Sequence, residues 1–334
     1  MKTQVSCFGA LAFVALLAGG TARGANDCGS IQQQLAALPA SGGTVTLGAG
    51  TWICSTPIVL DQNNVSLIGA GPTTILRLAA SANCPVLIVG SSAAAPSSGV
   101  ANVTVASLAV DGNRTAQQTE CWGGDCITHP VHNDGILIRM SSDVVVKDVT
   151  VSSAASGGLV VELSSVRVRV SGLTSFDNAY DGMAGYQTTQ SSFSNLSLHD
   201  NHAAGLSFDS QFNNNIVHNA VLASNHSDGI FMRDSNGNVF DTLQILNSTQ
   251  VGIYLAQVDL DASTPATANV FSGVVIENSG GPAMQVANAS CVNNVLSGAV
   301  LIGNASCVSQ PIPGLVRTSS VVCPGGGGLF FYPM

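Results

Sequence analysis

Apolar and polar residues alternate along most of the chain with a period of two, in a unit that recurs every 23 or 24 residues. The glycine that opens each unit stands at positions 135, 158, 182, 205, 229 and 252. The first and third residues after each glycine are apolar or glycine, as in Ile136 with Ile138 and in Leu206 with Phe208. Such alternation is typical of a strand with one buried face. The pattern therefore predicts one short strand in each unit, with these two positions pointing inward.

A second strand-like run follows the first in each unit. These runs cover residues 144–151, 166–170, 193–198, 216–222, 239–245, 270–276 and 295–301. A unit of short strands without a helix cannot bury a core by itself, so it must stack on its neighbours. We therefore predict an all-β solenoid, a single-domain parallel β-helix with coils of 23–24 residues, over residues 26–334. The last interval, 31 residues long up to Ala283, predicts an inserted loop at residues 259–268.

Two further patterns belong to this architecture. Residues 30–38 have a capping residue and the apolar spacing of one short N-terminal capping helix, which would cover the first coil. Asparagines also recur at fixed offsets, before the second strand and before the repeat glycine, at Asn215, Asn238, Asn269 and Asn294 and at Asn178, Asn201 and Asn225. Side-chain amides can bond to the backbone at turns and to one another from coil to coil, so we predict a structural role for them.

The composition narrows the range of functions. Only 9% of the residues are charged, which excludes a solvated helical bundle and a disordered chain. A net charge of −9 leaves no basic surface for nucleic acid or for an anionic membrane. The cysteine and histidine spacings match no metal-ligand set, and no glycine-rich motif is followed by a helix or a lysine. We expect a monomer that needs neither a metal nor a cofactor.

The first 25 residues have the layout of a secretory signal peptide, with Lys2, an apolar stretch at 7–17 and small residues at 18–25. Removing them leaves eight of the nine cysteines, which in a secreted protein predicts up to four disulfides. The preferred pairs are Cys28 with Cys54 and Cys121 with Cys126. No later stretch reaches the roughly 18 apolar residues that a membrane-spanning helix needs. Eight Asn-x-Ser/Thr sequons would allow glycosylation, although such triplets also arise by chance in a chain rich in these residues.

The second and fourth residues after each glycine point outward, and stacking aligns them from coil to coil about 4.8 Å apart. We call these two columns the outward strip. Its fourth-position column contains Arg139, Glu162, Tyr186, Asp209 and Arg233, and its second-position column contains Phe231 and Tyr254. Nearby stand the aspartates and histidines of the turns, namely Asp134, Asp181, Asp228, His132, His202 and His226. The strip predicts a groove for a sugar chain; alternatively, the opposite charges simply pair on a solvated sheet.

The turn sequence of residues 177–231 repeats an Asp or His, an Asn, an Asp-Gly pair and a hydrophobic residue, and a strand with a Phe-x-Asn-Asn-like sequence follows. These motifs resemble the right-handed parallel β-helix superfamily that contains pectate lyases, and most closely the catalytic module of alginate (mannuronan) C5-epimerases. The resemblance places the Asp of the family's Asp-Gly turn on Asp181. At the family's second acidic position, five residues later, this chain has Tyr186. Where the epimerases carry Tyr-Gly-Phe-Asp-Pro-His, it has Gly-Gly-Leu-Val-Val-Glu ending at Glu162.

The leading hypothesis is a secreted enzyme that acts on a uronic-acid polysaccharide by β-elimination or C5 epimerisation. That chemistry needs a cation at the uronate carboxylate, a base for the C5 proton and an acid. The substrate-binding candidates are Arg139, Arg233, Phe231 and Tyr254. Tyr186, with a pKa lowered by the arginines, would be the base or acid, and His202 a reserve base. Glu162, Asp209 and Asp181 complete the predicted catalytic set.

Two other functions remain open from the sequence. An inverting glycoside hydrolase could use Glu162 and Asp209, which lie two rungs or about 9.6 Å apart, near the upper end of the range that leaves room for a water molecule. A noncatalytic solenoid could use the same strip only to bind carbohydrate.

Overall fold

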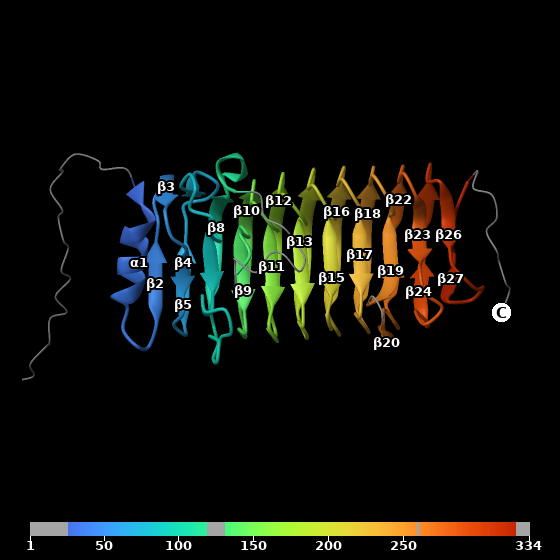
Figure 1. Ribbon diagram of the computed structural model, residues 1–334, viewed down its shortest axis with the longest axis horizontal. Coiled ribbons are helices and arrows are strands. Elements are labelled where there is room, and N and C mark those ends of the chain that lie inside the picture. Colours follow the sequence, from blue (N-terminus) through green and yellow to red (C-terminus); the bar gives the residue numbers. More distant parts are fainter. Residues whose placement is uncertain (1–25, 119–130, 259–260, 325–334) are drawn as a thin grey trace, which may run out of the picture.

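The computed structural model describes residues 26–118, 131–258 and 261–324, and these wind through successive coils that stack in a row (Figure 1). The predicted parallel β-helix is confirmed, because strands of successive coils pair in parallel across two sheets. The predicted signal peptide and the predicted Cys121–Cys126 pair lie outside the described residues.

A 16-stranded sheet, which we call the long-strand sheet, runs along one side of the molecule. Its main path is β1 (Asn26–Asp27), β3 (Gly50–Cys54), β6 (Thr74–Leu78), β8 (Thr104–Asp111), β10 (Val145–Ser152), β12 (Arg169–Phe176), β14 (Ser192–His199), β16 (Ile216–Ala223), β18 (Val239–Leu246), β21 (Val270–Ser272), β24 (Asn294–Ser297) and β27 (Val316–Ser319). Four strands join this path from the side, namely β2 (Gly43–Thr46), β5 (Val65–Ile68), β22 (Val275–Glu277) and β25 (Val300–Ile302).

An 11-stranded sheet, which we call the short-strand sheet, contains the strands that follow the repeat glycines. Its order is β26 (Ser306–Ser309), β23 (Pro282–Val286), β19 (Ile253–Val258), β17 (Ile230–Arg233), β15 (Leu206–Asp209), β13 (Met183–Tyr186), β11 (Leu159–Glu162), β9 (Ile136–Arg139), β7 (Leu87–Val89) and β4 (Ile58–Leu60). The predicted insertion contains β20 (Asp261–Pro265), which pairs antiparallel with the end of β19. A short 3₁₀ helix, η1 (Arg114–Ala116), follows β8.

The long strands turn a corner at a single residue in the left-handed conformation. Asp148, Asn195 and Asn219 have φ values of 52°, 54° and 53°, and Gly172 occupies the same place in β12. Asparagine and glycine tolerate this conformation better than other residues. The corner also shifts the alternation by one residue, so that Val146 before it and Val149 after it are both buried. This shift explains why the run predicted at 166–170 proved to be a strand at Arg169–Phe176.

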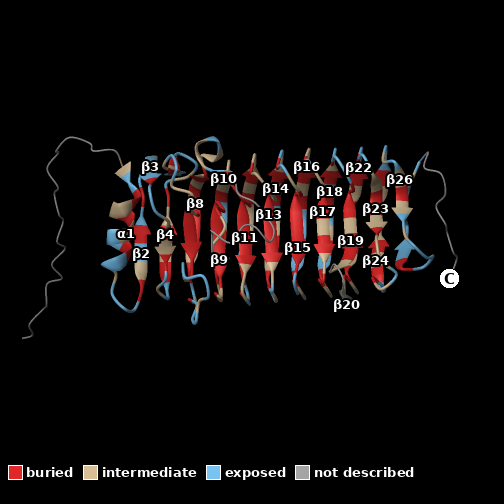
Figure 2. Cartoon of the chain, in the orientation of Figure 1, coloured by how far each residue is buried: buried red, intermediate tan, exposed pale blue. Residues whose placement is uncertain are grey.

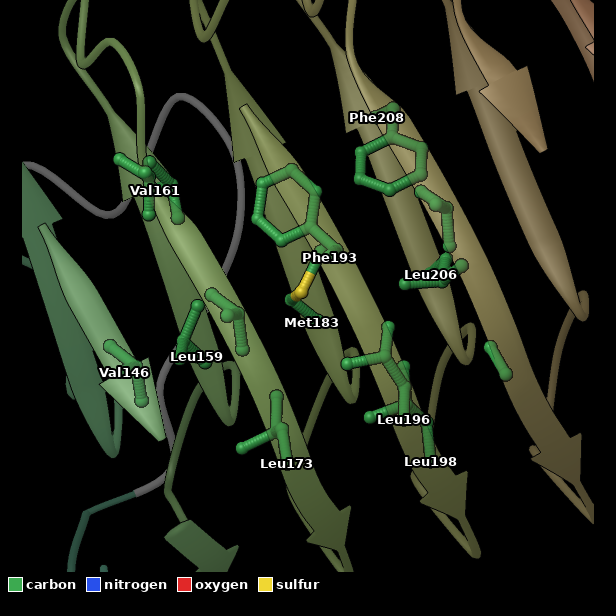
Figure 3. Packing of buried hydrophobic residues seen from close by; sticks show 14 of the residues in the cluster. Val146, Leu159, Val161, Leu173, Met183, Phe193, Leu196, Leu198, Leu206 and Phe208 are labelled. Carbon is green, nitrogen blue, oxygen red and sulfur yellow. The ribbon is translucent and has the colours of Figure 1, made fainter. Parts of the chain in front are cut away.

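The inward residues of the short-strand sheet form the core as predicted, and the buried face runs through every coil (Figure 2). Leu159, Val161, Met183, Leu206 and Phe208 are completely buried and pack against residues of the opposite sheet (Figure 3).

Gly185, at an inward position of β13, makes room for a phenylalanine. A Cβ atom there would lie 2.5 Å from the ring of Phe212, which stacks on Phe208 with ring centroids 3.9 Å apart. Phe240 and Phe271 continue the aromatic packing into the next coils.

The predicted asparagine ladders are confirmed, and all their members are buried. The amide of Asn178 donates to Asn201 at 2.8 Å, and that of Asn201 donates to Asn225 at 3.0 Å. In the second ladder Asn215, Asn238, Asn269 and Asn294 are linked in the same way. The first ladder also explains the repeat glycines, because a Cβ on Gly182 would meet the Asn201 amide at 2.7 Å. Asn225 is a sequon residue, and its burial in the ladder excludes it as a glycan acceptor in the folded protein.

The N-terminal helix α1 (Cys28–Ala36) covers the first coil as predicted (Figure 1). Its N-cap is Asp27, which accepts a hydrogen bond from the backbone of Gly29, and so the helix begins earlier than the predicted residue 30. The buried residues Ile31 and Leu35 face the coil.

The predicted Cys28–Cys54 disulfide is confirmed, and it joins α1 to β3. Cys307 and Cys323 form a second bond in the last coil. Cys84 and Cys291 are free thiols, so the eight cysteines beyond residue 25 do not form four disulfides. Burial raises the pKa of the Cys84 thiol to about 11, which makes it a poor nucleophile. Disulfides such as Cys28–Cys54 and Cys307–Cys323 are typical of proteins in oxidising compartments.

Candidate functional site

The outward strip lies on the solvent side of the short-strand sheet, in the predicted register. Arg139 on β9 pairs with Glu162 on β11, and Tyr186 on β13 pairs with Asp209 on β15. In the second-position column Phe231 on β17 pairs with Tyr254 on β19. The strands therefore align the predicted side chains in two columns, as the period of two requires.

Arg139 is buried, and its guanidinium is already used inside the protein. Its Nε donates to Glu162 Oε1 at 2.6 Å, and its terminal nitrogens donate to the carbonyls of Ser91, Ala93 and Ala94 at 3.0, 2.6 and 3.3 Å. These bonds fix a loop against the start of the strip. With 3% of its surface exposed, Arg139 cannot approach a sugar carboxylate as the sequence predicted.

Arg233 and Asp209 form the second ion pair of the strip. Arg233 donates from Nε and Nη2 to Asp209 Oδ2 at 3.0 and 2.5 Å. The same guanidinium lies over the Phe231 ring, 5.2 Å from its centroid, and Phe231 stacks on Tyr254 at 5.5 Å. Arg233 is thereby held in one orientation while about a quarter of its side chain stays exposed.

Tyr186 differs from the prediction in its acidity. Burial, followed by the charges of Asp181, Asp134 and Asp209, raises the pKa of its phenol well above the usual value. The arginines that were expected to lower this pKa are instead paired with Glu162 and Asp209. Tyr186 therefore remains protonated at neutral pH, where it can donate a proton but cannot act as a base.

The pKa of Asp181 is raised as well, and this brings the titration of its carboxyl close to neutral pH. Its pKa is raised to about 6, chiefly by burial and to a smaller extent by the nearby Asp228, while hydrogen bonds from Ala204 and Ser207 oppose the rise. The bond from the Ala204 backbone N–H is 2.9 Å long. Burial also raises the pKa of Asp228 to about 6.

The aspartates of the Asp-Gly turns occur in every second coil, directly before β9, β13 and β17. Each accepts a 2.9 Å hydrogen bond from the next coil, Asp134 from Gly157, Asp181 from Ala204 and Asp228 from Val251. The acceptor role explains their regular spacing. Only Asp181 precedes the strand that carries Tyr186.

Ser207, on β15, joins the two residues with shifted acidity. Its side chain is hydrogen-bonded both to Asp181 and to Tyr186. It belongs to the second-position column, between Ala184 and Phe231 in the register. The period of two places Ser207 in this column but assigns it no role, and the only signal is a small polar residue between apolar and aromatic ones.

His202 lies away from this cluster. Its Nε2 is 3.5 Å from Asp177 Oδ1, and its ring packs on His226 at 4.9 Å. Asp177 also accepts a 2.6 Å hydrogen bond from Arg114. The structure therefore places the predicted reserve base in a separate polar group beside β12 and η1.

Glu162 and Asp209 flank Tyr186 on neighbouring strands, as the hydrolase hypothesis requires. Each of them accepts a hydrogen bond from an arginine, Glu162 from Arg139 and Asp209 from Arg233. Within the described residues, no group of three or more His, Cys, Asp or Glu side chains could hold a metal ion. No helix in the described ranges is long and apolar enough to cross a membrane.

Comparison with solved structures places this arrangement among known folds. The A-module of mannuronan C-5 epimerase AlgE6 from Azotobacter vinelandii superposes with a TM-score of 0.56 at 17% identity, over 90% of this chain and 96% of that one. The catalytic domain of a GH87 alpha-1,3-glucanase gives 0.58 at 12% identity, over 90% and 68%. Tailspike protein 2 of bacteriophage CBA120, in its enzymatically active domain, gives 0.59 at 13%, over 83% and 43%. At such identities the likeness concerns the fold, which this chain shares with carbohydrate-active enzymes.

Sequence comparison reaches the level of the family. No curated protein sequence is detectably similar to this chain. The family described as "Right handed beta helix region" matches residues 94–225 and 134–312, and these matches together span more than half of the chain. The protein therefore belongs to the right-handed β-helix family.

Proposed function

We propose that the protein is a carbohydrate-active enzyme that removes the C5 proton of a uronic acid residue in a polysaccharide, as a lyase or a C5-epimerase. The observation that carries this proposal is the cluster of Asp181, Ser207 and Tyr186. Ser207 hydrogen-bonds to both groups; the pKa of the Asp181 carboxyl is raised to about 6 and that of the Tyr186 phenol well above its usual value, so that at neutral pH one is ionised and the other protonated, as an acid and base pair requires.

The two pKa shifts assign the roles. Above about pH 6 Asp181 is ionised and can take the C5 proton, whereas Tyr186 stays protonated and can give one. In elimination the C5–H electrons form a C4–C5 double bond, the C4–O bond breaks, and the leaving oxygen takes the proton from Tyr186. In epimerisation the C4–O bond stays intact, and C5 receives a proton on its opposite face from Tyr186.

Arg233 is the cation that neutralises the uronate carboxylate in this proposal. Its orientation is fixed by Asp209 and Phe231, so little conformational freedom is lost when a carboxylate binds. Removal of a proton next to a carboxylate builds negative charge on that group, and a fixed guanidinium stabilises this charge. Phe231 and Tyr254 form the apolar edge beside it. Glu162 takes a supporting position through its bond to Arg139.

The test is incubation of the purified protein with a panel of uronate polysaccharides in D₂O. Elimination produces an unsaturated sugar that absorbs in the ultraviolet, and epimerisation introduces deuterium at C5. Asp181→Asn and Tyr186→Phe should each lower either rate by roughly 10²–10⁴-fold, the usual contribution of a general acid or base. Asp148→Asn is the matched control, because this exposed aspartate sits at a left-handed corner that asparagine accepts. Unchanged rates in both Asp181→Asn and Tyr186→Phe would contradict the proposal.

The same incubations separate the alternatives. Release of reducing ends without ultraviolet absorbance or deuterium uptake would support an inverting hydrolase that uses Glu162 and Asp209. Binding without turnover of any acidic or neutral glycan would support a carbohydrate-binding solenoid.

A further inference from the structure

Exposure changes sharply along the second-position column of the outward strip. The outward residues of its second-position column are almost completely buried from β7 to β15, with exposed fractions of 1% for Ile88, 1% for Leu137, 3% for Val160, 2% for Ala184 and 7% for Ser207. From β17 onward Phe231, Tyr254 and Gln285 are partly exposed. The two halves of one geometrically regular column therefore differ in whether solvent reaches them.

The covered half is held in place by specific contacts. Leu137, Val160 and Ala184 form an apolar cluster on the outer face, and Val131 and Tyr186 pack against it. Next to this cluster, Arg139 ties three loop carbonyls, those of Ser91, Ala93 and Ala94, to the strip at β9. A sugar chain could lie along β9 and β11 only if these contacts were broken.

The reacting cluster stands at the boundary between the two halves. Ser207 is the last buried residue of the column, and Arg233 with Phe231 begins the accessible part in the next coil. A polysaccharide that lies along the accessible coils therefore reaches Asp181 and Tyr186 with its terminal residues, and the covered coils stop it there.

We propose that the protein acts on the end of a polysaccharide chain rather than at internal residues, with the chain lying over β17, β19 and β23 and its terminus at β13 and β15. This inference rests on the proposed function for the identity of the reacting residues. It goes beyond that function because an uncovered strip would accept any internal segment.

The first experiment measures binding, so that it does not depend on turnover. Asp181→Asn protein is titrated with one oligouronate in four forms, unmodified, blocked by a bulky group at either end, and blocked at both ends. One of the two end groups should weaken binding by at least about tenfold, equivalent to about 1.4 kcal/mol, while the other has little effect. Equal affinity for all four forms would overturn end recognition, and absence of binding by all four would overturn this proposal and the proposed function together.

The second experiment follows the products formed by the wild-type protein. An end-acting lyase releases short products of one size from the first time point, with little early loss of viscosity, and an end-acting epimerase labels terminal residues first. Arg139→Gln, which frees the loop carbonyls, should shift the pattern toward internal sites. A rapid fall in viscosity with wild-type protein would overturn the inference but leave the proposed function intact. If an end group weakens binding but no polysaccharide is turned over, the proposed function is overturned and end recognition is retained.

Discussion

The two faces of the short-strand sheet are both largely buried between β9 and β15, yet they bury different chemistry. On the inner face Met183 and Phe208 are completely covered and apolar, and burial of such surface stabilises the fold by about 25 cal/mol per Å². On the outer face Arg139 and Asp209 are nearly as covered, and burial of charged groups is unfavourable unless they are paired. The inner face therefore supplies the stability that allows the outer face to hold ionisable groups in an apolar setting.

The largest expected effect is on the free energy of unfolding, and it should come from a residue of the aromatic core. Phe212→Ala should lower the free energy of unfolding by about 3–5 kcal/mol, because Phe212 fills the space at Gly185 and stacks on Phe208. Urea denaturation measures this loss. Ile216→Ala, at a residue that is 51% exposed on the long-strand sheet, should cost under about 0.5 kcal/mol. Equal losses would mean that the core is not the main source of stability.

The outer face should instead produce a dependence of stability on pH. The pKa of Asp228 is about 6 in the folded protein and 3.8 without burial, so the folded state binds more protons between these values. The stability contributed by this group should therefore be greatest below about pH 4 and be lost as the pH rises from about 4 to about 6, by up to about 3 kcal/mol.

Asp228→Asn tests this dependence, because asparagine can still accept the hydrogen bond from Val251 but carries no charge. The variant should be more stable than wild type at pH 7 and should show a flatter profile between pH 4 and 7 in thermal melts. Asp148→Asn is again the control. If the Asp228→Asn profile retains the full slope, the Asp228 carboxyl is not the source of the pH dependence.

The next effect concerns the hydrogen bonds that join Asp181 and Tyr186. Ser207→Ala removes a donor to the Asp181 carboxylate, and a bond to a charged group is worth about 1.5 kcal/mol or more. The pKa of Asp181 should therefore rise further, and the ascending limb of any pH–rate profile should move to higher pH with it. Carbon-13 NMR titration of the carboxyl measures the shift in the absence of substrate. Ser207→Thr should restore it, and an unchanged titration in Ser207→Ala would remove the serine from the cluster.

The smallest effect should come from buried polar residues in the turns that lead into the short-strand sheet. The first asparagine ladder is interrupted at Ser248 and Ser279, whose buried hydroxyls have no hydrogen-bond partner among the residues that the structure describes. Ser248→Asn with Ser279→Asn should restore the ladder and raise the free energy of unfolding by about 1 kcal/mol per site. Thermal denaturation measures the gain, and Ser248→Ala is the comparison that removes the hydroxyl without adding an amide. A loss of stability in the double variant would show that these coils lack room for the amide.

The sequence predicted the strands and the columns because both follow from local rules. A period of two predicts which side chains share a face of the sheet, and a constant interval predicts which residues stack from coil to coil. The alignment of Arg139 with Glu162 and the asparagine ladders could therefore be assigned from the sequence. The burial of Phe208 and Val161 followed from the same rule.

What could not be predicted depends on contacts between distant segments. The burial of Arg139 results from a loop 45 or more residues earlier in the chain, whose carbonyls replace solvent around the guanidinium. The pKa of Tyr186 moved opposite to the expectation because burial and three aspartates outweigh arginines that are neutralised by their own partners. The corner at Asp148 could not be located because the left-handed conformation leaves only a weak preference in the sequence.

The left-handed corners of the long strands also limit how many strands an inserted residue can disturb. An extra residue within one strand would turn the side chains after it from inside to outside, but the next corner can absorb the shift and restore the correct phase. The turns between the two sheets tolerate length changes as well: across the insertion between β19 and β21, Phe240 still pairs with Phe271, and Phe271 with Leu296. A coil can thus accept a segment of new length at a turn while the neighbouring coils keep their alignment.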